Sequence, residues 1–193
     1  MIQSKQDYRH YVEMDAKALG ITKRTDVFLV LNWIAPNYIW KFQKLLRKKE
    51  YYLNCKKGIV NKMFYYYLKI KHRKLALRLG FSIPENVFGP GLAIIHSGTI
   101  IVNSKARIGA NCRIHACTNI GASGGVKKAP QIGDNVYIGP GAKIYGDIKI
   151  GNNIAIAANA AVGKSFEEDN IVIGGVPARK IKSIDIRQII KHI

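Results

Sequence analysis

Histidine is the residue type in this chain whose chemistry best suits catalysis near neutral pH. An imidazole has a pKa near neutrality, so it can remove the proton of a hydroxyl group while that oxygen attacks. Two histidines, His96 and His115, lie 19 residues apart in the C-terminal half. The three cysteines show no Cys-x-x-Cys spacing and no cluster with histidine, so we expect free thiols and no metal site.

A six-residue period organises the C-terminal half and predicts its fold. Every sixth residue there is aliphatic: Val102, Ile108, Ile114, Ile120, Val126, Ile132, Ile138, Ile144, Ile150, Ile156 and Val162. This period fits neither a helix of 3.6 residues per turn nor an alternating strand. It predicts a parallel β-helix of hexapeptide repeats, a three-sided prism of about 18 residues per coil. His96 and His115 then lie on neighbouring coils, offset by one position.

Glycine often follows the aliphatic position, at Gly109, Gly121, Gly133, Gly139 and Gly151. We expect these glycines in tight turns with left-handed backbone angles. One segment, Gly121–Pro130, is rich in glycine and ends in proline. It predicts a loop that leaves the prism although Val126 keeps the phase, and loops on rigid scaffolds often carry function.

The N-terminal half has helical spacing, and its helices are expected to cap one end of the prism. We expect helices at Ser4–Leu19, Thr25–Trp33, Tyr38–Tyr52 and Ile59–Leu79, the last closed by Gly80. The predicted organisation is a basic α-helical domain at residues 1–80, a β-helix domain at residues 81–180 and a C-terminal tail or short helix at residues 181–193.

The charge is strongly positive and concentrated in the helical part. The chain has 31 Lys and Arg against 12 Asp and Glu, a formal net charge of +19, and 18 of the basic residues precede residue 81. Such a surface attracts polyanions, and the alternative is a solvated helix face. Nucleic acid is disfavoured because no recognition module is present. Without an apolar run of about 18 residues or a signal peptide, we expect a cytoplasmic protein, with contact to an anionic membrane at its inner face left open.

Four blocks in residues 91–181 resemble the hexapeptide-repeat acyltransferases, in particular the serine acetyltransferase group: His96–Val102, Asn119–Ala122, Ile138–Gly146 and Gly174–Arg179. The helical half is similar to the members found among capsule and exopolysaccharide genes. The resemblance implies a left-handed parallel β-helix and acetyl transfer from acetyl-CoA, as co-substrate, to a hydroxyl. It also implies a homotrimer with active sites in the clefts between prisms, and a possible pairing of trimers.

The resemblance also assigns roles to residues. His96 stands where the family has its catalytic histidine and is interpreted as the general base, the alternative being a hydrogen-bonded structural histidine. His115 is a second catalytic or acceptor-binding candidate, the alternative being exposure to solvent. Backbone N–H groups of Gly121 and Ala122 are candidates for the oxyanion. The CoA arm is expected along Gly139, Pro140, Gly141, Ala157 and Ala158, with its phosphates at Lys164, Arg179 and Lys180.

Departures from the serine acetyltransferase pattern shape the expected acceptor. The group has an aspartate directly before the catalytic histidine, where this chain has Ile95, and an Arg-His pair where this chain has Lys128 and Ala129. The group's aspartate about fifteen residues before the histidine is also missing, and Glu85 is the nearest acid. An ammonium buried without an anionic partner costs several kcal/mol.

These departures favour a neutral acceptor, and we predict an O-acetyltransferase that modifies a sugar hydroxyl of a polysaccharide or its precursor. The first alternative is a serine O-acetyltransferase of cysteine biosynthesis. The second, from a different class, is a non-catalytic basic scaffold or interaction protein.

Overall fold

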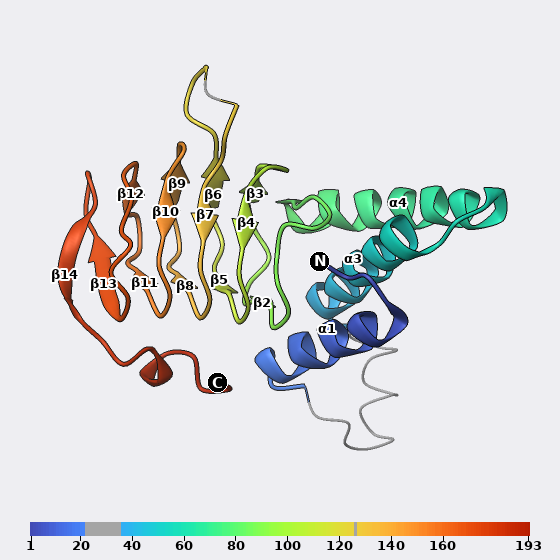
Figure 1. Ribbon diagram of the computed structural model, residues 1–193, viewed down its shortest axis with the longest axis horizontal. Helices are drawn as coiled ribbons and strands as arrows, with labels where there is room; N and C mark the ends of the chain where they lie inside the picture. Colours follow the sequence, from blue (N-terminus) through green and yellow to red (C-terminus); the bar gives the residue numbers. More distant parts are fainter. Residues whose placement is uncertain (22–35, 126) are drawn as a thin grey trace.

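The computed structural model describes residues 1–21, 36–125 and 127–193, and contains a helical part followed by a stack of short strands (Figure 1). Three helices are described: α1 (Lys5–Ala18), α3 (Tyr38–Cys55) and α4 (Ile59–Leu79). They confirm three of the predicted helices, and the fourth, Thr25–Trp33, lies outside the described residues. Ser4 begins α1 by accepting a hydrogen bond from the Asp7 N–H at 2.9 Å, and Gly80 ends α4 in the left-handed conformation.

Fourteen strands form three sheets, which are the sides of a prism. The first side contains β1 (Phe81–Ser82), β3 (Ile100–Val102), β6 (Thr118–Gly121), β9 (Lys143–Tyr145) and β12 (Ala161–Val162). The second contains β4 (Arg107–Ile108), β7 (Gln131–Ile132) and β10 (Lys149–Ile150). The third contains β2 (Ala93–Ile94), β5 (Arg113–Ile114), β8 (Tyr137–Ile138), β11 (Ala155–Ile156), β13 (Ile171–Gly174) and β14 (Arg179–Ser183).

The six-residue aliphatic positions form the core, as the sequence predicts. In the described part of the chain, every one of them from Val102 to Val162 is at most 5% exposed. All strand pairs are parallel except β13 with β14, and each places like positions beside one another, as with Ile114, Ile138 and Ile156. The structure is therefore a parallel β-helix of hexapeptide repeats, and the sequence period is its coil repeat.

One coil is longer than the next, and the difference explains the loop. Ile114 pairs with Ile138 and Ile138 with Ile156, so these coils are 24 and 18 residues long. The excess of one hexapeptide lies in the 121–130 segment, which projects from the prism next to β6 and β7 (Figure 1). The six-residue phase survives in the sequence because the insertion has the length of one repeat. Val126 itself is outside the described residues.

The role predicted for the repeat glycines is corrected by the structure. Left-handed backbone angles occur mainly at asparagines, among them Asn111, Asn135 and Asn153, which donate to one another along the prism at 2.8 Å. Gly109 and Gly139 do not have positive φ angles. At both, a Cβ would lie 2.7 to 2.8 Å from a backbone oxygen of the next coil. These glycines are needed for the close stacking of coils, and asparagine serves the corners because it tolerates the left-handed region.

Buried polar side chains of α1 and α3 close the first coil of the prism. The Asp15 carboxylate accepts hydrogen bonds from the backbone N–H groups of Gly91 and Leu92, each at 2.9 Å. Arg47 donates to the carbonyl oxygens of Phe88 (2.9 Å) and Gly89 (2.6 Å). An open end of a β-helix leaves such groups unpaired, and unpaired buried groups are costly.

The same side chains pair with one another inside this contact. Arg47 Nε lies 2.8 Å from Asp15 Oδ2 and Arg47 Nη1 lies 3.1 Å from Glu50 Oε2, all with at most 2% exposure. Burial alone would lower the pKa of Arg47, but the two carboxylates more than offset it and raise that pKa. Gln43 adds a donor to the Leu92 carbonyl at 2.6 Å. The helical part is thus fixed to the prism by a saturated polar network.

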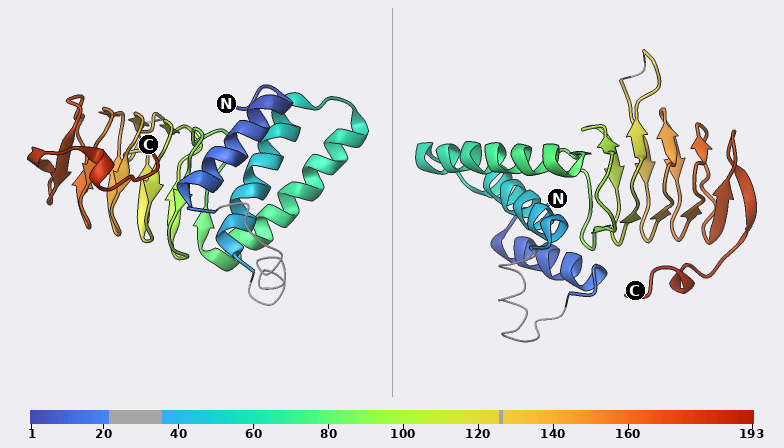
Figure 2. Two further views of the ribbon diagram at one scale, coloured as in Figure 1. Left: turned by 90° about the horizontal axis from the view of Figure 1, so that it is seen from below. Right: turned by 180° about the vertical axis from the view of Figure 1, so that it is seen from behind.

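The C-terminal segment differs from the predicted helix over Ile181–Ile193. The antiparallel strand β14 crosses the predicted domain boundary, and a short 3-10 helix, η1 (Ile186–Gln188), follows. Ile186 and Ile190 pack on Ala155 and the neighbouring Tyr137, so the tail runs back along the third sheet toward α1 (Figure 2). Among the described helices, none is long and apolar enough to cross a membrane.

Removing the Asp15 carboxylate tests the closure of the first coil. We expect Asp15→Ala to lower the free energy of unfolding by about 3 to 5 kcal/mol, because Arg47 stays buried without its main partner. Urea denaturation followed by circular dichroism measures this change. The control is Arg187→Ala, which breaks an exposed ion pair with Asp185 and should leave the unfolding midpoint unchanged. Equal midpoints for the two variants would contradict this role of Asp15.

Candidate active site

His96 and His115 lie together at one edge of the prism, where the third sheet turns into the first. Their ring centroids are 5.9 Å apart. Parallel pairing of Ile94 with Ile114 places them on neighbouring coils with the predicted offset of one position. The His96 side chain is exposed and that of His115 is partly buried. An exposed imidazole beside a second one can receive a proton from a bound hydroxyl group.

His115 lies between His96 and an aromatic ring that the sequence analysis did not single out. Its ring centroid is 5.1 Å from that of Tyr137, which lies one coil further along the prism. Burial first, then the charges of Arg113 and His96, lowers the pKa of His115 below its ordinary value. His115 is therefore neutral at neutral pH, and its buried Nε2 has no hydrogen-bond partner among the described residues. The 24-residue spacing of Arg113 and Tyr137 would have identified these neighbours, had the looped-out hexapeptide been counted.

The predicted CoA-arm residues continue the edge that carries the two histidines. The Gly141 N–H donates to the Ala116 carbonyl at 3.0 Å, and the Asn159 N–H donates to the Pro140 carbonyl at 2.8 Å. Gly139 and Ala157 follow His115 in register. Side chains this small leave the backbone of three successive coils open to a linear ligand. Arg179 pairs with Gly174, next to Ala157, and is exposed at the same edge.

The other predicted site residues lie at a different edge of the same prism. Gly121 ends β6 at the side of the first sheet away from His96, and Ala122 begins the projecting loop. The exposed Lys164 follows β12 on the same side, so within one chain neither the expected oxyanion donors nor this cation approaches His96. Lys180 is exposed and forms an ion pair with Glu168 at 2.5 Å.

The acid nearest in sequence to the missing carboxylate does not serve His96. Glu85 lies 3.2 Å from the buried Lys49 ammonium and accepts a hydrogen bond from Tyr65 Oη at 3.1 Å. Lys49 also contacts His72 Nδ1 at 2.9 Å. This group joins α3 and α4 to the start of the prism, so its role is packing of the helical part.

The loop carries a charge pair of both signs. Lys128 Nζ lies 2.8 Å from Asp147 Oδ2, and both side chains are exposed. Lys105, Lys127 and Gln131 share the hollow around this pair, whose volume is about 420 Å³. Such a pair can exchange its internal contact for the two charges of a zwitterion.

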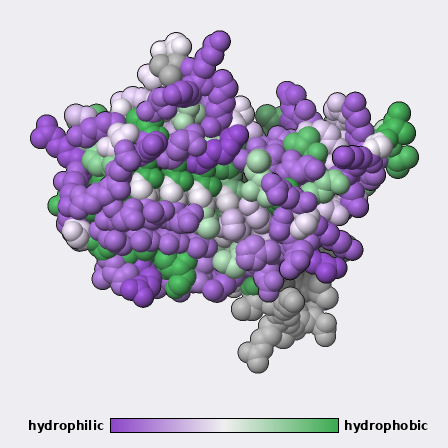
Figure 3. Space-filling view, in the orientation of Figure 1, coloured by the Kyte–Doolittle hydropathy of each residue, from purple (hydrophilic) through white to green (hydrophobic). Residues whose placement is uncertain are grey.

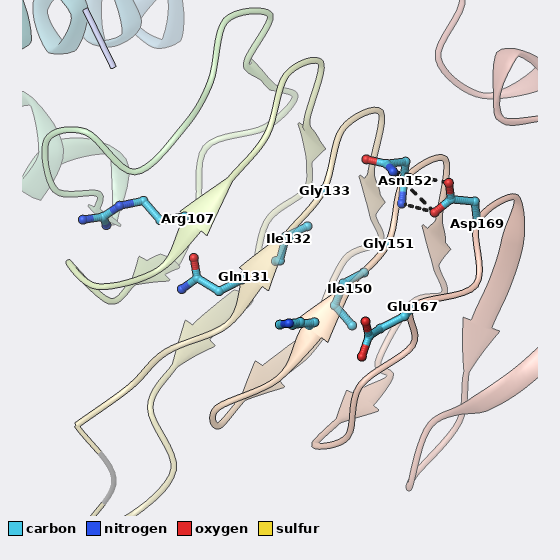
Figure 4. Close-up of a pocket in the computed structure, with 10 residues that line it drawn as sticks. Arg107, Gln131, Ile132, Gly133, Ile150, Gly151, Asn152, Glu167 and Asp169 are labelled. Carbon is cyan, nitrogen blue, oxygen red and sulfur yellow. Dashed lines mark hydrogen bonds between the residues drawn. The ribbon is translucent and has the colours of Figure 1, made fainter.

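A second hollow lies away from all predicted site residues. It has a volume of about 470 Å³ and follows the second sheet, with Arg107 at one end and Glu167 and Asp169 at the other (Figure 4). Asn152 and Asp169 are hydrogen-bonded there and belong to the corner contacts between coils. In the described ranges, no three His, Cys, Asp or Glu side chains gather as a metal ion would require.

The neighbours of His115 generate a titration prediction. In Arg113→Ala, the pKa of His115 should rise part of the way toward its ordinary value, because one of the charges that lower it is gone while burial remains. The pH dependence of the His115 imidazole C–H resonances in NMR measures this. Arg107→Ala, on the second sheet, is the matched control and should leave the titration unchanged. An unchanged or lower pKa in Arg113→Ala would contradict the assigned contact.

Comparison with known proteins gives the same family from sequence and from structure. The bacterial transferase hexapeptide family (six repeats) matches residues 129–164. A serine acetyltransferase of Mycobacterium tuberculosis is 38% identical over 100 residues, which are 51% of this chain and 43% of that protein. One of Staphylococcus xylosus is 29% identical over 184 residues, covering 92% of this chain and 76% of the relative. A Brucella abortus serine acetyltransferase solved with coenzyme A superimposes with a TM-score of 0.70 at 26% identity, covering 93% of this chain and 70% of that one.

These relatives correct the expected acceptor. The sugar hydroxyl of a polysaccharide was predicted from Ile95 and the missing acids, but the similar proteins are named serine acetyltransferases, so the main prediction was wrong and its first alternative is better supported. The chain spans less than half the length of the Mycobacterium relative. The repeat, the fold and these similarities together support an enzyme of the acyltransferase class and a place in the hexapeptide-repeat acetyltransferase family.

Proposed function

We propose that this protein transfers the acetyl group of acetyl-CoA to the hydroxyl of L-serine, with His96 as the general base. The observation that carries the proposal is the position of His96, exposed beside His115 at the start of an edge of small residues. The relatives named serine acetyltransferase, one of them solved with coenzyme A, supply the acceptor and the donor.

The proposed reaction needs no group beyond the two substrates and the side chains present. His96 takes the hydroxyl proton while the serine oxygen attacks the thioester carbonyl. The C–S bond breaks as the tetrahedral intermediate collapses, and the imidazolium returns the proton to the leaving CoA thiolate. The neutral His115 fits this scheme, since a second cation beside His96 would disfavour the imidazolium that must form.

The separation of the two edges supports a site shared between chains. Gly121, Ala122 and Lys164 do not approach His96 within one prism, yet the resemblance assigns all of them to the site. A homotrimer, with left-handed prisms side by side, would bring one chain's loop edge to the histidine edge of the next. Pairing of trimers and a cytoplasmic location stay predictions, and the second agrees with the use of acetyl-CoA.

The pair of Lys128 and Asp147 offers an answer to the missing aspartate. Lys128 stands where the serine acetyltransferase group has arginine, and its ammonium can bind the carboxylate of serine. Asp147, 2.8 Å away, can bind the serine ammonium in place of the carboxylate that Ile95 replaces. We therefore propose that these two loop-edge side chains hold the amino acid while His96 acts on its hydroxyl.

Replacement of His96 is the direct test of the proposed base. His96→Ala should lower kcat for acetyl transfer to L-serine by about 10² to 10⁴, the usual contribution of a general base. Release of the free CoA thiol from acetyl-CoA measures the rate. His10→Ala, an exposed histidine of α1, is the matched control and should keep full activity. Undiminished turnover in a folded His96→Ala protein would eliminate His96 as the base.

Acceptor analogues test the charge pair separately. Asp147→Asn should lower kcat/KM for L-serine by about 10-fold, the value of one charged hydrogen bond. It should leave 3-hydroxypropanoate, which lacks the ammonium, unaffected. The same assay on Asp185→Asn controls for the loss of one exposed carboxylate. An equal loss with both acceptors would show that Asp147 does not recognise the ammonium.

A further inference from the structure

Helix α4 exposes a stripe of large apolar side chains along most of its length. The residues, 50 to 77% exposed, are Ile59, Met63, Tyr66, Ile70 and Leu77. Their spacing of four, three, four and seven residues puts them on one line of the helix surface. Val60 and Tyr67 lie beside this line and are also exposed.

The stripe lies on the face of α4 that the fold does not use. Leu68, His72, Ala76 and Leu79 are the buried residues of the helix and attach it to α3 and the prism. The hairpin of α3 and α4 extends away from the prism (Figures 1 and 2), and hydrophobic surface is visible at its far end (Figure 3). Core packing therefore does not explain the apolar residues of the outer face.

Basic side chains border the stripe on both sides, and all six are exposed. At about 100° per residue, Lys62, Lys69 and Arg73 fall on one flank, and Lys71, Lys74 and Arg78 fall on the other. The segment Ile59–Leu79 contains no Asp or Glu. The ammonium of Lys71 lies 4.6 Å from the ring centre of Tyr67, so cation and ring occupy one surface. The result is an apolar line between two rows of positive charge.

The combination of charge and apolar surface selects one kind of partner. A second copy of α4 would bring six cations against six with no acid in either helix to pair them. A nucleic acid would meet the cations but leave the apolar line in water. An anionic bilayer satisfies both, with phosphate and carboxylate head groups at the cations and the acyl boundary at the apolar line.

We propose that α4 docks this protein on the surface of an anionic phospholipid membrane, lying in the interface plane. Tyr66 and Tyr67 suit the head-group level because their rings are apolar and their hydroxyls polar. Helix α4 is separate from His96 and its edge, so lipid binding is independent of the proposed acetyl transfer.

Vesicle flotation with the full chain tests the docking, without acetyl-CoA or acceptor. Binding is expected to phosphatidylcholine vesicles that contain about 30 mol% phosphatidylserine and not to phosphatidylcholine alone. Lys69→Glu/Lys71→Glu/Lys74→Glu should lower the partition coefficient by at least about 100-fold, since each cation near an anionic surface contributes about a factor of ten. Lys105→Glu/Lys149→Glu/Lys182→Glu changes the net charge equally on the prism and should retain most of the binding.

A second variant separates insertion from simple attraction of charges. Ile70→Ser/Leu77→Ser keeps every cation and should weaken vesicle binding by about 10-fold. Equal binding of this variant would overturn the interfacial helix. Equal loss in both triple-lysine variants would overturn the assignment to α4, and so would equal binding to neutral vesicles. Preference for DNA over anionic vesicles, or a mass on light scattering that halves in Ile70→Ser/Leu77→Ser without any lipid binding, would assign the face to another partner.

Discussion

Stacking of successive coils is the constraint on which the rest of this structure depends. Each coil can satisfy its backbone hydrogen bonds only by lying in register on the next, and each inward aliphatic residue must rest on its counterpart. Ile114, Ile138 and Ile156 show this arrangement. Positions such as Gly109 and Gly139 must then lack a side chain, because the next coil's backbone lies where a Cβ would be. The edges of the prism are consequently straight columns of equivalent residues.

The candidate site is a consequence of these columns. His96 and His115 meet because they occupy one edge on neighbouring coils, and Gly139 and Ala157 extend that edge as an open track. The projecting loop belongs to another edge, where Lys128 and Asp147 form their exposed pair. A rigid prism cannot bend one edge toward the other. Chemistry that uses both therefore favours a second chain, which is why the proposed activity and the proposed homotrimer depend on each other.

The sequence predicted what is periodic and missed what is local. The aliphatic period predicted the β-helix, and capping and periodicity predicted α4 to its last residue. The buried contact of Asp15 and Arg47 was not predictable, because the partners are 32 residues apart and no pattern links them. Tyr137 was missed because the looped-out hexapeptide shifts the coil spacing from 18 to 24 residues. The acceptor was wrong because Ile95 was weighed without the charge pair that the loop edge provides.

The central claim is that the edge beginning at His96 receives the acyl thioester. A crystal structure of the protein with CoA and L-serine bound tests it most directly. The account predicts the CoA thiol and the serine hydroxyl within about 3.5 Å of the His96 imidazole, with the pantetheine arm lying along Gly139 and Ala157. CoA bound in the hollow of the second sheet, or at any position from which its thiol cannot reach His96 of either neighbouring chain, would contradict it.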